Sequence, residues 1–194
     1  DTGSTTAGDV FLNVVKKVYE LDCNYVGIKN MTITAEKDDD GDSQIVIKAT
    51  NAVTSNTDAA TTTDGTTAAD TSETGIWAKV DSKVGDLGSY IASVKNIETI
   101  IEIDASTLTA DTIDLESVNE LKMSTQGVGI GVAVNVASAS SMVLVKNSNL
   151  TSTKNGIKLL AKSVIESKAD AQAKAGNVAV GVSVISGSTE ASIT

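Results

Sequence analysis

The sequence predicts an all-β fold in which successive stretches of chain stack on one another as the coils of a β-solenoid. A glycine- and valine-rich segment at 127–144 returns fifty positions later at 177–194, and a second, two-strand pattern occurs three times. The chain also has no proline and only 3% aromatic residues, so Val, Ile, Leu and Ala must fill its core in thin layers. A repeat of this size in β-prone residues is typical of stacked strands.

In the fifty-residue repeat, Gly131 and Val132 reappear unchanged at Gly181 and Val182. Branched residues alternate in both copies with Gly, Ala or Ser, which is the two-residue period of a strand. If the branched side chains face the core, the small residues on the other face let a neighbouring backbone approach closely. We therefore expect 127–144 and 177–194 to form two repeated β-arms.

The three-copy pattern predicts a register as well as strands. The same alternating pattern begins at Ile45, Ile113 and Ile157. Eight residues later each copy again has an aliphatic residue, namely Val53, Leu121 and Ile165. Each copy follows a short piece of similar sequence that begins at Thr32, Thr107 or Asn149. Two strands in fixed order, repeated three times, indicate the coils of a solenoid.

Residues 158–175 also fit a helix, because Leu160, Val164 and Ala171 fall near helical spacing and Gly176 suits a helix C-terminus. The register match to 113–121 favours a strand instead. Residues 50–75 are rich in Thr, Ala and Asp, and we expect an ordered excursion from the stack there. We predict that 1–194 is one continuous solenoid segment of a longer, processed chain.

Composition excludes several classes of function. The chain has no histidine and its basic residues are all lysine, so the usual general base, zinc ligand and bidentate phosphate clamp are missing. A net charge of −10 disfavours nucleic acid and anionic membranes. No apolar run is long enough to span a bilayer, and we expect no direct membrane insertion.

The single cysteine, Cys23, is expected to be a small buried hydrophobe. Tyr19, Tyr25, Tyr90 and Trp77 could stack on a sugar, but scattered aromatics of this kind favour local packing.

An acidic cluster is the one candidate metal site. Glu36, Asp38, Asp40 and Asp42 surround Gly41, and oxygen ligands around a glycine turn resemble a calcium loop. The twelfth position is Ile47, so the bidentate acid of such a loop is missing. A solvated acidic turn is the favoured interpretation, and we predict no cofactor, with calcium as a weak candidate.

Glycan-active β-helix enzymes need Arg or Lys bases with calcium, or paired carboxylates on neighbouring coils. Asp114 and Glu116 correspond to Val46 and Lys48 in one copy, and to Lys158 and Leu160 in another. Charges that vary in this way indicate outward-facing, solubilising residues. We therefore predict no catalytic residues and no enzyme.

Four segments of the C-terminal half together resemble one repeat unit of fusobacterial leukotoxin-like proteins and of large secreted adhesins and autotransporter passengers. They are Gly131-Val-Ala-Val-Asn-Val, Met142-Val-Leu-Val, Asn149-Leu-Thr-Ser and Gly156-Ile-Lys-Leu-Leu-Ala-Lys-Ser. Where the family carries an aromatic residue, this chain has Val143 and Ser192. The resemblance implies a right-handed parallel β-helix that is exported to a bacterial surface and has no catalytic residues.

The expected function is therefore structural or adhesive: a rigid β-helical rod or extracellular fibre, secreted or at the bacterial cell surface. Its expected partner is a host-cell or matrix surface, or copies of itself end to end. A segment of a secreted leukotoxin-like toxin and a glycan-active β-helix enzyme are the alternatives.

Overall fold

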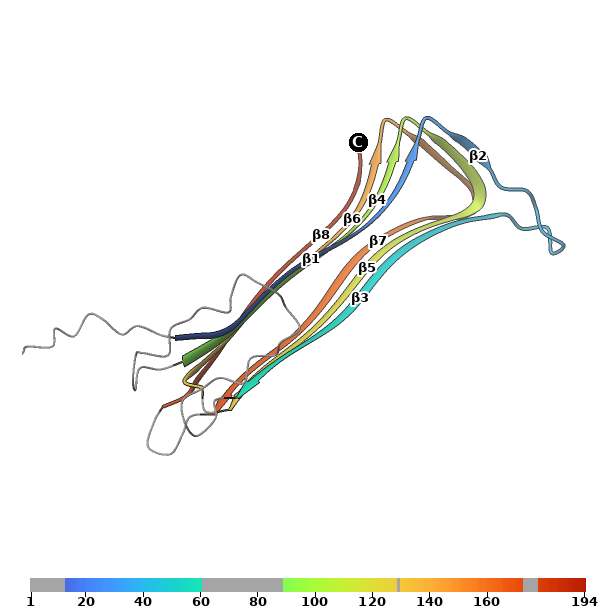
Figure 1. Ribbon diagram of the computed structural model, residues 1–194. Helices are drawn as coiled ribbons and strands as arrows, with labels where there is room; N and C mark the ends of the chain where they lie inside the picture. The colour runs from blue at the N-terminus through green and yellow to red at the C-terminus, as the bar shows by residue number, and fades with distance from the viewer. Residues whose placement is uncertain (1–12, 61–88, 129, 173–177) are drawn as a thin grey trace, which may run out of the picture.

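The chain folds into two parallel β-sheets and alternates between them (Figure 1). The computed structural model describes residues 13–60, 89–128, 130–172 and 178–194. Sheet A contains β1 (Asn13–Lys29), β4 (Ser89–Asp104), β6 (Val132–Lys146) and β8 (Val180–Ile193), in that order. In sheet B, β5 (Thr107–Val128) lies between β7 (Asn149–Gln172) on one side and β2 (Thr32–Thr34) and β3 (Gln44–Ala60) on the other. The all-β prediction is confirmed.

The register predicted for sheet B is confirmed. Ile45 pairs with Ile113, and Ile113 pairs with Ile157, while Thr32 pairs with Thr107 in the short preceding strand. Residues 158–172 belong to β7, so the helical alternative is wrong over this range. Of the Thr-rich segment, residues 50–60 extend β3, and the remainder to residue 75 lies outside the described residues.

The strands of sheet A pair two residues away from the fifty-residue spacing of the sequence repeat. Val132 pairs with Val180 and Ala133 with Gly181, a spacing of 48. A shift of two residues leaves every side chain on the same face, so the alternating pattern does not distinguish the two registers. The segments expected as β-arms supply β6 and β8, which are neighbouring strands of sheet A.

The orientation considered for the valines is also wrong in β6. Its small side chains face inward, since Ala133, Ala137 and Ala139 are at most 1% exposed, whereas Val132 and Val134 lie on the outer face, half-buried. Small inward residues allow the sheets to approach closely here. Near the turns, where Figure 1 shows the gap between the sheets at its widest, the core is built from larger side chains. These include Ile101, Ile103, Leu115, Val143 and Val145.

The turns between the sheets stack as regularly as the strands. Asn30, Ala105 and Asn147 each adopt a positive φ of 47 to 54°. Their amides donate hydrogen bonds to a carbonyl of the next coil, as Ala105 N does to the oxygen of Lys146 at 3.1 Å. Asparagine tolerates this conformation better than alanine does, so Ala105 is the strained member. The hydrogen bonds to the neighbouring coils hold the turn in this strained conformation.

Polar side chains run through the middle of the core and bond to one another. Asn119 is 0% exposed; Thr99 donates a hydrogen bond to its carboxamide oxygen, and its Nδ2 donates to the carbonyl of Ser140 at 2.5 Å. Asn135 repeats the arrangement with Thr125 and the carbonyl of Lys168. A one-residue slip would turn these groups outward and leave their partners unpaired, so the network stabilises one register.

Candidate functional site

The outer face of sheet B carries ion pairs that link three successive strands. Glu116 on β5 accepts contacts from Lys48 on β3 at 2.7 Å and from Lys158 on β7 at 2.5 Å. These lysines, Lys158 first, hold the pKa of Glu116 at about 2, below its ordinary 4.5. The sequence-based expectation that Asp114 and Glu116 face outward is confirmed by their register on β5.

Sheet A has a similar cluster around Glu102. Tyr25 donates a hydrogen bond to its carboxylate at 2.5 Å, and Lys146 and Lys29 lie 3.1 and 3.2 Å away. The tyrosine hydrogen bond, followed by those of the lysines, lowers the pKa of Glu102 to about 2. A carboxyl group held ionised in this way cannot act as a general acid near neutral pH.

Stability is expected to fall in acid because of these two carboxylates. Both pKa values are lower in the folded chain than the ordinary 4.5, so the unfolded chain binds more protons below that pH. Their contribution is complete above about pH 4.5 and is lost as the pH falls toward 2. Urea unfolding at a series of pH values measures how steeply the free energy of unfolding falls with pH.

In the variant that combines Glu102→Gln with Glu116→Gln, the free energy of unfolding is expected to decline less steeply as the pH falls from about 4.5 toward 2. Glu190→Gln, on the edge strand β8, is the matched control and should keep the wild-type slope. If the double variant loses stability with falling pH as steeply as the wild-type chain, Glu102 and Glu116 are not the cause of the loss.

Away from the Glu102 cluster, the outer face of sheet A carries an apolar row that runs across its strands. Register places Tyr19, Val94, Val136 and Val184 in one row across β1, β4, β6 and β8. Tyr19 is 66% exposed, and Leu21, two residues along β1, is 64% exposed. The outer face of sheet A therefore combines an apolar row at the level of Tyr19 with the ion-paired cluster of Glu102 nearer the turns.

The expectation of a buried cysteine is wrong on this face. Cys23 is exposed on β1 and not buried, with its Sγ 3.9 Å from a carboxylate oxygen of Glu98. Desolvation and the charge of Glu98 raise the pKa of its thiol, so the thiolate is disfavoured. Tyr25 packs locally, with its ring over Gly27 and its hydroxyl on Glu102, whereas Tyr19 is exposed on the sheet. The side chains of Tyr90 and Trp77 lie outside the described residues.

The acidic cluster forms a turn between β2 and β3. Asp38 Oδ1 accepts hydrogen bonds from the backbone amides of Asp40 and Asp42 at 3.1 and 2.9 Å. Asp42 in turn binds Lys154 at 2.5 Å. Among the described residues no three acidic side chains gather as a metal site, and Glu36 and Asp40 stay exposed. The calcium candidate stays a prediction.

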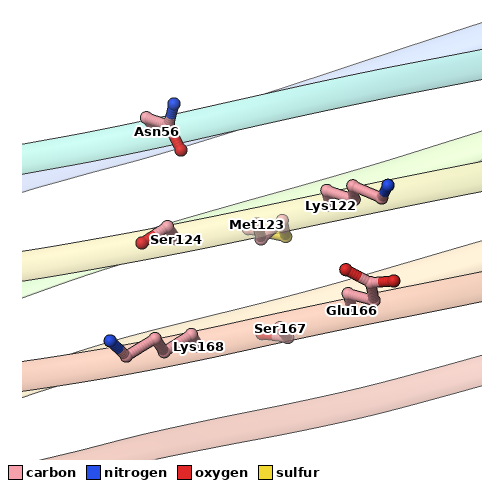
Figure 2. A pocket seen from close by; sticks show the side chains of 7 residues that line it. All are labelled: Asn56, Lys122, Met123, Ser124, Glu166, Ser167 and Lys168. Atoms are coloured by element: carbon pink, nitrogen blue, oxygen red, sulfur yellow. The ribbon is translucent and has the colours of Figure 1, made fainter.

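A shallow hollow of about 300 Å³ lies on sheet B away from the turns. Figure 2 shows Lys122 and Ser124 on β5 beside Glu166 and Lys168 on β7, all among the residues that line it. Lys122, Ser124, Glu166 and Lys168 occupy outward-facing register positions on β5 and β7. The lining of the hollow includes the short side chain of Ser124 beside longer charged side chains, and sequence patterns gave no signal for it.

Comparisons of the chain with protein-family models, curated proteins and solved structures found no match. No helix long and apolar enough to cross a membrane is present in the described part of the chain.

Proposed function

We propose that this chain is a segment of a right-handed parallel β-helix that serves a structural or adhesive role in a secreted or surface-exposed bacterial protein. The observation that carries the proposal is the strand-for-strand stacking of successive coils in both sheets. β4 and β6 pair over 15 positions without a bulge, and β5 leads from one to the other through the second sheet. Connections between parallel strands of one sheet are right-handed in about 98% of cases, which supports the handedness.

The surface chemistry supports a scaffold over an enzyme. Glu102 and Glu116 are each bound by lysines of neighbouring strands, so their charges serve cohesion between coils. The apolar row of sheet A, with Tyr19 and Leu21 exposed at its β1 end, supports contact with another surface, because exposed aromatic side chains are common at binding interfaces.

Adhesion is tested with beads that carry the purified chain, applied to host-cell monolayers and to extracellular-matrix films. We expect retention of the beads at physiological salt. Tyr19→Ser combined with Leu21→Ser removes the two most exposed described side chains of sheet A's apolar face and is expected to reduce retention several-fold. Val46→Ser is the matched control, because Val46 is 50% exposed on the opposite sheet.

If beads with the Tyr19→Ser/Leu21→Ser variant and beads with Val46→Ser are retained equally, sheet A is not the adhesive face. If beads with the wild-type chain are not retained, the adhesive role is wrong. Liposome leakage would favour the toxin alternative. Depolymerisation of an acidic polysaccharide would favour the enzyme.

A further inference from the structure

The ring of Tyr25 is fixed on the outer face of sheet A and remains half open to solvent. A Cβ atom at Gly27 would lie 2.7 Å from both the Cε1 atom and the hydroxyl oxygen of Tyr25, so the ring fills the space above this glycine. The hydroxyl donates to Glu102 on the neighbouring strand β4 at 2.5 Å. Tyr25 is nevertheless 50% exposed. Part of the ring therefore packs on the sheet, and part of it is available for contact.

Two lysines hold the carboxylate that anchors this ring. Lys29 and Lys146 lie 3.2 and 3.1 Å from the oxygens of Glu102, whose side chain is mostly buried. A tyrosine held at both its ring and its hydroxyl has little conformational freedom left to lose when a ligand stacks on it. Each ammonium group has three donors, so contact with one carboxylate leaves donors for a ligand.

Apolar side chains continue the surface beside Tyr25. Register places Ile100 of β4 and Met142 of β6 next to it, and both lie half-buried on the outer face. We call Tyr25, Ile100 and Met142 the Tyr25 row. Neighbouring strands are about 4.8 Å apart, so the row spans about 10 Å. Charged side chains border it, since Glu98 stands two residues before Ile100 and Glu102 two residues after it.

The charges around the Tyr25 row disfavour an acidic ligand. Three carboxylates and two ammonium groups lie at its borders on the outer face: Glu98, Glu102, Asp104, Lys29 and Lys146. The whole chain has a net charge of −10, which also repels anions. A neutral sugar meets no such repulsion. Its hydroxyls can donate to carboxylates and accept from ammonium groups, while its C–H face stacks on an aromatic ring.

We propose that the Tyr25 row binds a neutral glycan, with one hexopyranose ring stacked on Tyr25 and the next ring over Ile100 and Met142. The lysines and carboxylates at the borders hydrogen-bond the sugar hydroxyls. This site goes beyond the proposed adhesive role, because it names a class of ligand. It also uses a different part of sheet A from Tyr19 and Leu21, which lie further along β1 from the turn.

Titration of the isotope-labelled chain, followed by NMR, tests the ligand class. The probes are the neutral trisaccharides cellotriose, chitotriose and mannotriose, with a hyaluronan tetrasaccharide as the acidic comparison. We expect at least one neutral trisaccharide to shift the ring signals of Tyr25 and the amide signals of Ile100 and Met142 saturably. We expect no such shifts with hyaluronan. No shift with any of the three neutral sugars, or tighter binding of hyaluronan, would overturn the proposal.

Variants test whether the fixed ring is responsible. Tyr25→Ala is expected to weaken binding by about tenfold or more, and Tyr25→Phe by less, because the ring stays while its anchor to Glu102 is lost. Gly27→Ala is expected to weaken binding several-fold, because the added Cβ displaces the ring. Met31→Ala is the matched control, since Met31 is also 50% exposed but lies outside the Tyr25 row. Circular dichroism shows whether each variant keeps its strands.

Binding that survives Tyr25→Ala, or that Met31→Ala weakens equally, would overturn the glycan site. Failure of this site is distinguishable from failure of the adhesive role, because retention of beads is tested with substitutions at Tyr19 and Leu21. Beads that are retained while no trisaccharide binds would leave adhesion and remove the glycan site. Beads that are not retained while a trisaccharide binds would do the reverse.

Discussion

Replacement of Asn119 by alanine is expected to lower the free energy of unfolding by about 3 kcal/mol. Asn119 is fully buried between the sheets, where its carboxamide accepts from Thr99 and donates to the carbonyl of Ser140. Removing it leaves both partners without a hydrogen bond and opens a cavity. Equilibrium unfolding in urea measures the loss, with circular dichroism as the probe.

Asn51 provides a matched control for this prediction. It pairs with Asn119 in the register of sheet B, so it occupies the same column one coil earlier. Its Nδ2 is buried without a hydrogen-bond partner, and alanine at this position removes an unpaired polar group. We expect Asn51→Ala to cost less than about 1 kcal/mol. Equal losses at the two positions would show that hydrogen bonding in the column is not what stabilises it.

Gly181→Ala is expected to destabilise the chain by about 2 kcal/mol, through the attachment of β8. A Cβ atom at this position would overlap the backbone carbonyl of Ala169 on β7, and a backbone atom cannot move away as a flexible side chain can. Urea unfolding measures this loss in the free energy of unfolding. Hydrogen exchange is expected to locate it in the amides of β8 and β7.

Gly187→Ala on the same strand is the control. Its Cβ would meet the end of the Ile165 side chain at 3.4 Å, which is ordinary contact. Alanine also restricts the unfolded chain more than glycine does, so we expect no loss or a small gain in stability. If both variants lose stability equally, close approach of the two sheets at Gly181 is not the cause.

Sequence reasoning predicted sheet B in detail because its columns contain distinctive residues. Ile45, Ile113 and Ile157 stand at the start of three related templates, and each template follows a short strand of similar sequence. Two independent matches of this kind determine a register.

In sheet A, by contrast, β6 and β8 are nearly uniform in their alternation of valine with small residues. Registers that differ by two residues then look alike, and 48 was mistaken for fifty. The alternation also does not say which face is the core. The inward position of Ala133 depends on Ala169 and Ala171 of β7, which pack against the same cluster at that level.

The candidate surfaces were only partly predictable. The outward direction of Glu116 and its place beside Lys48 followed from the repeat, but its bond to Lys158 is diagonal, because the register pairs Lys158 with Asp114. The exposure of Cys23 was missed because a lone cysteine among apolar residues usually indicates burial. Which face of β1 is covered depends on β3, which lies across the core.

In-register stacking of the coils is the central feature of this fold, and backbone NOEs across the strands of the isotope-labelled chain test it directly. We predict contacts that connect Ile45 to Ile113 and Ile113 to Ile157 in sheet B, with the pattern of parallel strands. In sheet A we predict contacts from Val94 to Val136 and from Val136 to Val184. Antiparallel contacts within one chain, or contacts displaced by one residue in either sheet, would contradict the stacked fold.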